Sequence, residues 1–181
     1  MHASTFAETL ERRSTIRNFS SQDVSEAILA ELLTLVLKAP SSGNSQCWAV
    51  IKTRDQQQKK RLYECHNHQN VVLSAPLILT FCGDYNRVRH WLDARGASQS
   101  YDDLLGLLTC YTDAIIAATT LAYLCESKGL GTCFLGTATW NMEKIADALK
   151  LPQYVVPAVG LAVGWPEQPP MQTDKDVYKR Q

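Results

Sequence analysis

The sequence lacks a net charge. Its 181 residues include 18 lysines and arginines and 18 aspartates and glutamates, so the formal charge at neutral pH is zero. Proteins that bind nucleic acid or an anionic membrane surface carry a basic excess on the binding face. The balance supports neither partner, and a ligand has to be sought in local clusters of side chains.

The sequence also lacks a hydrophobic run near its N-terminus and a C-x-x-C pair. The opening stretch MHASTFAETLERRST has no apolar segment of the kind that a secretory signal needs. The six cysteines are scattered, and several stand inside apolar runs, where a free thiol behaves as a small hydrophobe. We therefore expect a cytoplasmic protein with reduced thiols in its core.

Two nucleotide-binding signatures are absent. No G-x-G-x-x-G follows a strand, and no G-x-x-x-x-G-K-S/T occurs, which argues against a Rossmann domain and a P-loop. No internal repeat, low-complexity run or linker divides the chain. The sequence therefore predicts one domain.

The hydrophobic pattern alternates between helical and strand periodicity. A helix is predicted after the N-cap Ser25, ending at Pro40, and another begins at Asp55. A later helix over residues 141–151 takes Asn141 as N-cap, with Trp140 packed on Ile145. Strands are predicted over residues 48–53, 75–84 and 155–165, with a strand or loop over residues 131–136.

One long segment, residues 103–128, is apolar on nearly every face and ends before Gly129, which suits a left-handed C-cap. Its length approaches that of a membrane span, but Asp113, Gly106 and the lack of flanking basic clusters favour a helix buried in protein. The pattern as a whole predicts an α+β or α/β domain with this helix at its centre.

Two polar clusters are candidates for ligand binding. Arg12, Arg13 and Arg17 alternate with Ser14 and Thr15, and arginine forks with hydroxyl groups are suited to hold a phosphate. A solvated basic face is the alternative.

The stretch APSSGNSQCWAV places Ser41, Ser42, Asn44, Ser45 and Gln46 around Gly43, as either a donor-rich cradle or an ordinary turn. Composition alone favours the turn.

The sequence gives little support for a metal site or for a catalytic nucleophile. His66 and His68 have H-x-H spacing beside Cys65, but no second pair of ligands converges on them. No Ser-His-Asp or Cys-His arrangement can be argued from the spacing. We expect neither a metal site nor a catalytic side chain.

Taken in order, five stretches resemble the FMN-dependent nitroreductase superfamily, and within it the NADPH-dependent, oxygen-insensitive nitroreductase and flavin reductase branch. They are RSTIRNF, APSSGNSQCW, VVLSAPLILTFCGDYNR, ESKGLGTCFLG and LKLPQYVVPAVGLAVGWP. The resemblance implies an α+β fold, an α/β sandwich whose mixed central sheet is flanked by helices, with one long buried central helix. It also implies a homodimer with FMN at the interface, each FMN contacted by both subunits.

The resemblance further implies a role for individual residues in FMN binding. The motif that binds the phosphate and ribityl chain matches Arg13, Ser14, Thr15 and Arg17, and the polar loop that reaches the flavin from the other subunit matches Pro40, Ser41, Ser42 and Asn44. The amide that bonds to the pyrimidine edge of the flavin matches Gln69. The loop that lies over the ring matches Phe134, Leu135, Gly136 and Thr137. Ser14 departs from the family, in which a second basic residue or histidine is frequent. Cys47 is interpreted as structural.

The implied activity is hydride transfer from NADPH through flavin N5 to nitro compounds, quinones or free flavin, by a ping-pong mechanism in which FMN carries the chemistry. The alternatives are another flavin-dependent reductase or dehalogenase of the superfamily, and a flavin-binding protein without turnover.

The family continues beyond GWP with a Lys-Pro-Arg motif and a long extension. We expect residues 1–175 to be an incomplete domain, with Lys175 as a remnant of that motif. The sequence DVYKRQ, residues 176–181, can be back-translated as a transposase adapter and is expected to be a non-native tail.

Overall fold

The computed structural model describes residues 5–98 and 102–169. Lys175 and the expected non-native tail lie outside these residues. The elements follow in the order α1 (Phe6–Arg12), α2 (Glu26–Val36), the 3-10 turn η1 (Ser42–Asn44), β1 (Trp48–Thr53), α3 (Gln56–Cys65), α4 (Val71–Ser74), β2 (Leu77–Asp84), α5 (Tyr85–Asp93), α6 (Leu104–Ser127), β3 (Gly131–Leu135), α7 (Thr137–Trp140), α8 (Met142–Leu149) and β4 (Val155–Gly164).

The strands form one sheet in the order β1-β2-β4-β3, and every neighbouring pair is antiparallel. After β1 the helices α3 and α4 return the chain to the end of the sheet that it left, so that Ile78 lies opposite Thr53. Among the described residues the only parallel pairing is the isolated bridge between Thr15 and Thr132. The predicted mixed sheet is therefore wrong for these strands, whereas the α+β class is confirmed.

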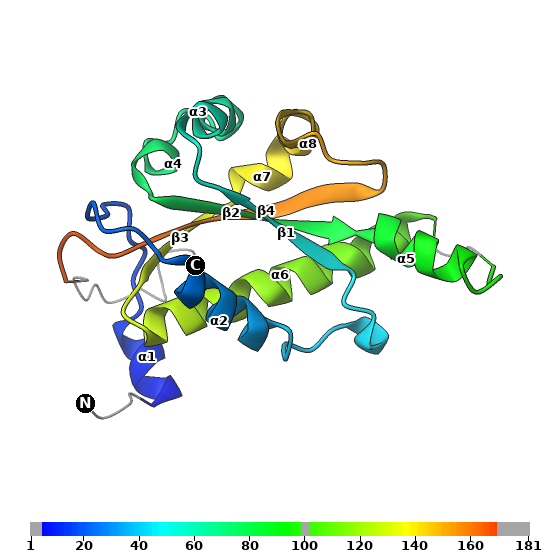
Figure 1. The fold of residues 1–181 in the computed structure, drawn as a ribbon, viewed down its shortest axis with the longest axis horizontal. Helices are drawn as coiled ribbons and strands as arrows, with labels where there is room; N and C mark the ends of the chain where they lie inside the picture. The colour runs from blue at the N-terminus through cyan, green and yellow to red at the C-terminus, as the bar shows by residue number, and fades with distance from the viewer. Residues whose placement is uncertain (1–4, 99–101, 170–181) are drawn as a thin grey trace, which may run out of the picture.

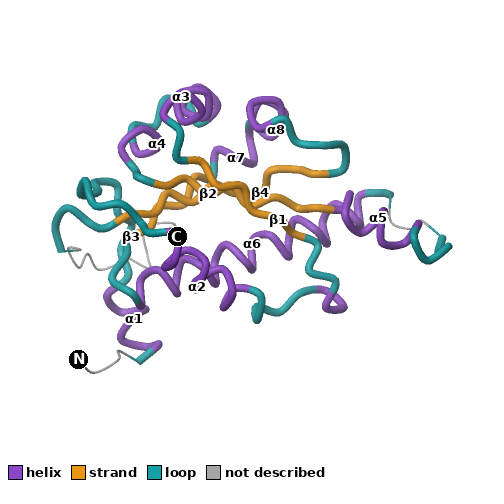
Figure 2. Tube along the Cα trace, in the orientation of Figure 1, coloured by secondary structure: helices purple, strands orange, loops and turns teal. Residues whose placement is uncertain are grey.

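Helices cover both faces of the sheet. In Figure 1, α3, α4, α7 and α8 lie above it, α1, α2 and α6 lie below it, and α5 extends beyond one end. Figure 2 shows the sheet as the orange layer between these two purple layers. The α/β sandwich implied by the sequence resemblance is present in this chain.

The side chains of β2 divide between two cores, because successive residues of a strand point to opposite faces. Leu77 and Leu79 pack below the sheet with α2 and α6, and Ile78 packs above it with α3, α4 and α8. This confirms the prediction of a fully buried strand. All six cysteines are free and buried, as expected.

The predicted long helix is α6. Asp103 caps its start by accepting a hydrogen bond from the Gly106 N–H, and Gly129 follows its end at φ 82°. Its length and composition alone would allow it to cross a membrane. In this fold it packs against β2 and β4 and buries Asp113. The expected burial is incomplete, because four leucines near its start are exposed: Leu104, Leu105, Leu107 and Leu108.

The predicted helix starts were only partly right. Ser25 and Asp55 cap α2 and α3 through their side chains, as expected, although α2 ends at Val36, before Pro40. Asn141 makes no side-chain cap at α8, because its amide donates instead to the carbonyl oxygen of Cys65 at 2.9 Å. Trp140 is 79% exposed, so the predicted packing on Ile145 is wrong.

Candidate functional site

The arginine segment, residues 13–17, follows α1 and runs along the outer edge of β3. The Ile16 N–H donates to the carbonyl oxygen of Thr132 at 2.9 Å, and Thr15 forms the parallel bridge with Thr132. Ile16 is buried, and a Cβ on Gly131 would lie 2.6 Å from its side chain. This close packing fixes the segment, while the side chains of Thr15 and Arg17 remain exposed.

Arg13 is half-buried beside Glu126, the penultimate residue of α6. Burial raises the pKa of the Glu126 carboxyl, and the hydrogen bond from the Thr132 hydroxyl and the charge of Arg13 oppose that rise. Arg17 lies near Cys133. The two arginines therefore flank the start of β3, where an anion would meet both charges.

The β3–α7 corner, residues 134–137, continues from this edge. Leu135 is fully buried in the upper core, so its side chain is not available to a ligand. Phe134 and Gly136 are exposed, and a Cβ built on Gly136 would meet nothing within 4 Å. The corner therefore offers an open surface beside an aromatic ring.

Backbone groups of β3 also point to this edge. Residues of an edge strand alternate between pairing with their neighbour and pointing N–H and C=O outward. Thr132 points outward, because its carbonyl oxygen accepts from Ile16. Phe134, two residues on, directs its N–H and C=O to the same side.

Gln69 reaches this corner from the turn between α3 and α4. Its Nε2 donates to the Thr137 hydroxyl at 3.2 Å. The same hydroxyl lies 2.7 Å from Nδ1 of His66, a residue that is fully buried at the end of α3. Burial lowers the pKa of His66 to about 4, so its ring is neutral at neutral pH.

His66 and His68 do not face a common site. His66 points inward to Thr137, whereas His68 is exposed and pairs with Glu64 at 2.7 Å. The two rings serve different contacts, and their H-x-H spacing has no common ligand.

The serine loop, residues 40–47, lies elsewhere, between α2 and β1. The buried carboxylate of Asp113 holds it from α6, accepting the Ser42 N–H at 2.9 Å and the Cys47 N–H at 3.2 Å. Gly43, Asn44 and Gln46 have φ near +50°, which the tight turn requires. The side chains of Ser42 and Asn44 are exposed.

Cys47 ends this loop beside Cys110 of α6, and both are buried. The hydrogen bond between the two thiols lowers the pKa of Cys47 and raises that of Cys110. A Cβ on Gly83 of β2 would lie only 3.0 Å from Cys110, so the helix and sheet approach very closely here. The surroundings of Cys47 are those of a packed core position.

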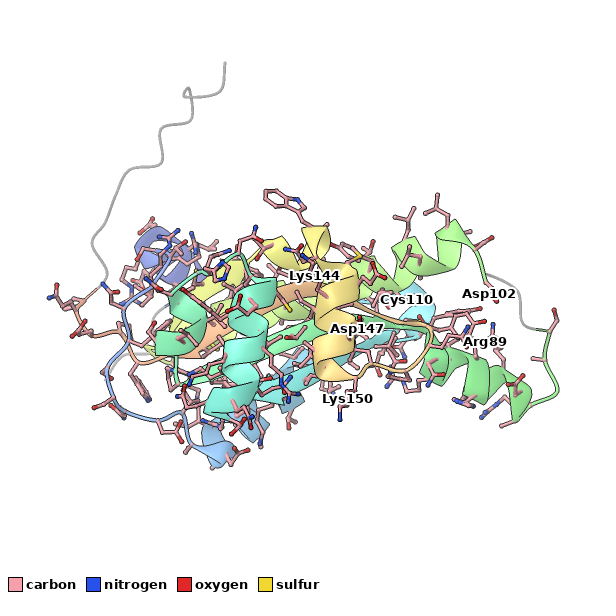
Figure 3. The ribbon with its side chains drawn as sticks, turned by 90° about the horizontal axis from the view of Figure 1, so that it is seen from above. Arg89, Asp102, Cys110, Lys144, Asp147 and Lys150 are labelled. Atoms are coloured by element: carbon pink, nitrogen blue, oxygen red, sulfur yellow. The ribbon has the colours of Figure 1, made fainter. Side chains whose placement is uncertain are left out.

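A small cavity of about 140 Å³ lies beyond Cys110, between β2, α6 and the chain before β4. An ion pair of 2.9 Å joins Arg89 of α5 to Asp102 at its side, and Figure 3 shows both residues at the α5 end, past Cys110. None of the predicted site residues lines this cavity. It is a feature separate from the candidate site.

Sequence reasoning missed the roles of Asp113 and His66. Asp113 served only as an argument against a membrane span, and His66 only as a rejected metal ligand. The available signal was chemical: a carboxylate within an apolar helix needs hydrogen-bond donors, and the nearest orphan donors are the N–H groups of a tight loop.

Comparison with known proteins places these features in context. The model of the nitroreductase family matches residues 10–165. A curated protein of Bacillus subtilis (strain 168) named FMN reductase (NAD(P)H) is 34% identical over 154 residues, which are 84% of this chain and 62% of that protein. The chain therefore spans less than two thirds of that relative's length.

Solved structures of other proteins share this fold. The structure of NfrA2 from B. megaterium superimposes with a TM-score of 0.89 at 31% identity, covering 97% of this chain and 71% of the other. The NADPH:FMN oxidoreductase from Vibrio harveyi, complexed with NAD+, gives a TM-score of 0.84 at 25% identity, covering 94% and 72%.

Proposed function

Since this chain belongs to the nitroreductase family, we propose that it acts as an FMN-dependent oxidoreductase that takes electrons from NAD(P)H. The proposed acceptors are nitro compounds, quinones or free flavin. The relatives named above as an FMN reductase and an NADPH:FMN oxidoreductase support the cofactor and the electron donor.

One observation carries the proposal: residues from distant parts of the sequence gather along β3. The arginine segment lies at the start of this strand, and Gln69 meets Thr137 just past its end. The open surface at Gly136 lies just past the end of β3, after the arginine segment at the start of the strand and next to Thr137, which Gln69 contacts. A flavin mononucleotide is long and has a phosphate at one end and a polar ring edge at the other, which suits this order of groups.

The chemistry of these groups fits FMN. Arg13 and Arg17 with the hydroxyls of Ser14 and Thr15 supply charge-assisted donors for a phosphate. The Gln69 amide uses one N–H on Thr137 and keeps Oε1 and its second N–H, which match the alternating acceptor and donor pattern of an imide edge. The outward N–H of Phe134 and that of Gly136 supply backbone donors near the ring.

The serine loop is proposed to complete the site of a second subunit. Asp113, which holds the loop, precedes the end of α6 by 14 residues, or roughly 21 Å of helix. In Figure 1 the cyan turn of the loop lies toward the α5 end, whereas β3 and the blue arginine segment lie at the other end. A two-fold axis across α6 would bring one copy's loop to the other copy's arginine segment.

The exposed leucines of α6 supply the proposed contact surface. Leu104, Leu105 and Leu108 are each more than half exposed on one stretch of helix. Contiguous apolar patches of this kind mark interaction sites on soluble proteins. Burial of this patch in a homodimer would also cover the part of α6 that the chain itself leaves open.

We also propose that the protein is cytoplasmic.

When bound, FMN would accept a hydride from NAD(P)H and pass two electrons to the next substrate at the same place, in a ping-pong cycle. The chain's own residues bind and orient the cofactor. Donors from Gln69 and from the β3–α7 corner would face the flavin ring and would stabilise negative charge on it. No side chain is assigned as an acid or base.

Reconstitution with FMN tests the proposal. The purified protein should take up FMN, turn yellow, bleach with NADPH and regain its colour with a nitroaromatic compound. A protein that neither takes up FMN nor oxidises NADPH would contradict it. Flavin uptake without NADPH oxidation would favour a binding protein without turnover, and bleaching without reoxidation by nitro or quinone acceptors would favour a dehalogenase or another reductase.

A further inference from the structure

The buried ring of His66 is the starting point. It lies at the C-cap of α3 with no exposed surface, and its Nδ1 is 2.7 Å from the Thr137 hydroxyl. Its Nε2 is buried and has no hydrogen-bond partner among the described residues. A buried polar atom without a partner lowers the stability of the fold. We therefore look for the role of this histidine at its other nitrogen, Nδ1, which contacts the Thr137 hydroxyl.

The Thr137 hydroxyl is shared between His66 and Gln69. It accepts a hydrogen from Nε2 of Gln69 at 3.2 Å, and a hydroxyl can accept and donate at once. Burial keeps the His66 ring neutral, so Nδ1 can either accept from this hydroxyl or donate to it, and the contact persists in both tautomers. The hydroxyl is therefore held from one side by the ring and from the other by the amide.

The backbone brings both side chains to the same hydroxyl. Asn67 and His68 adopt left-handed conformations, with φ of 53° and 57°, and the Gln69 N–H donates to the His66 carbonyl oxygen. Asn141 ties this turn to the end of α7, donating from Nδ2 to the Cys65 carbonyl oxygen and to Oδ1 of Asn67. His66 and Gln69 are thus the two ends of one fixed turn.

We propose that His66 is a positioning residue for FMN: it orients Thr137, which in turn holds the Gln69 amide with Oε1 and one N–H facing the imide edge of the flavin. This inference rests on the proposed function. A free Gln69 could rotate its amide and offer a donor where the imide N–H needs an acceptor. With Nε2 anchored to Thr137, the amide is set before the ligand arrives, so binding loses less conformational freedom.

The test compares His66→Leu, His66→Asn and Thr137→Val by titrating the protein with FMN and following flavin fluorescence. Loss of one hydrogen bond predicts an FMN Kd about five to tenfold higher for H66L and T137V. H66N, whose amide can reach the position of Nδ1, should recover most of the affinity. The matched control is His68→Asn, because His68 is exposed, has a left-handed φ that asparagine tolerates, and should leave the Kd unchanged.

A double-mutant cycle separates positioning from general structure. If His66 acts through Thr137, adding H66L to T137V changes the FMN Kd by less than about twofold, because the link is already broken. The midpoint potential of bound FMN should also become more negative in H66L, since a misplaced Gln69 stabilises the reduced ring less.

An H66L protein with the Kd and potential of the wild type, or effects that simply multiply in the double variant, would overturn the inference. Should H66L fail to fold, T137V and H66N carry the same comparison. A wild-type protein that binds no FMN would defeat the proposed function and the inference with it. Wild-type binding that His66 variants leave intact would defeat the inference alone.

Discussion

At the scale of single residues, the fold depends on a few buried polar groups whose partners are far away in the sequence. Asp113 is the clearest of these, because both of its oxygens accept backbone N–H groups of the serine loop. Among the described residues no side chain donates a hydrogen bond to Asp113, so the N–H groups of the serine loop are its hydrogen-bond donors. The shape of the loop and the burial of the carboxylate therefore depend on each other.

We predict that Asp113→Asn lowers the free energy of unfolding by about 1–3 kcal/mol, because one loop N–H then faces an amide NH₂ group instead of an acceptor. Urea denaturation followed by circular dichroism measures this. Asp147→Asn is the matched control, since Asp147 lies on the exposed side of α8 (Figure 3). A loss for D113N no larger than that for D147N would contradict the role given to Asp113.

His66 predicts a dependence of stability on pH. Its pKa is about 4 in the folded protein, against an ordinary value of 6.5, so below pH 6.5 the unfolded chain binds a proton that the folded chain does not. The free energy of unfolding therefore falls as the pH drops from 6.5 to 4, by about 3 kcal/mol for this residue, and levels off below.

The measurement is the difference in unfolding free energy between the wild type and H66N across this range, because carboxylates that titrate in both proteins cancel. A difference that stays constant from pH 7 to pH 4 would show that His66 takes up its proton over the same pH range in the folded and unfolded states, which would contradict its lowered pKa.

At the scale of elements, α6 and the sheet approach so closely at Gly83 that a larger side chain would not fit between them. A Cβ on Gly83 would lie 3.0 Å from the backbone carbon of Cys110, where α6 passes under β2. A backbone atom cannot move aside without shifting the helix.

Gly83→Ala is therefore expected to destabilise the protein by about 1–3 kcal/mol through overpacking. Gly136→Ala is its control, because its Cβ meets nothing within 4 Å and its φ of −65° suits alanine. Thermal unfolding of both variants, compared with the wild type, gives the result; equal melting temperatures for the two would rule out a tight helix–sheet contact at Gly83.

The elements that the sequence predicted well are those fixed by neighbours along the chain. Ser25 and Asp55 each cap the N–H group three residues on, and the apolar run of β2 is buried wherever it pairs. Asn141 failed as a cap because its amide found the carbonyl oxygen of Cys65, 76 residues away. No local pattern reports a competition of that kind.

In the candidate site, too, the sequence predicted the residues but not their distant partners. The resemblance predicted the arginine segment, the serine loop and Gln69 by residue type and order, but not the contacts that hold them: Ser42 bonds to Asp113, 71 residues away, and Gln69 bonds to Thr137, 68 residues away. The burial of Leu135 follows from its facing the upper core, which depends on the register of β3 against β4. Register is set by the whole sheet.

At the scale of the molecule, the leucines at the start of α6 predict a homodimer. Leu108→Glu places a charge on this patch and should weaken dimerisation at least about tenfold without unfolding the chain, because a buried unpaired charge is costly only in the assembled state. Sedimentation equilibrium measures it. Trp91→Glu on α5 is a control of equal exposure, 53% against 52%, and an L108E protein that remains dimeric at the wild-type concentration would refute the surface.

The distance between the serine loop and the arginine segment has a genetic consequence. A chain with a defective loop and a chain with defective arginines are each expected to lack a working site when alone. Mixed in one cell, they would form heterodimers of the proposed kind, in which one of the two sites takes its loop from the second chain and its arginines from the first and is intact, whereas the other site carries both defects. Random pairing restores about a quarter of the wild-type sites, so two inactive alleles would complement each other.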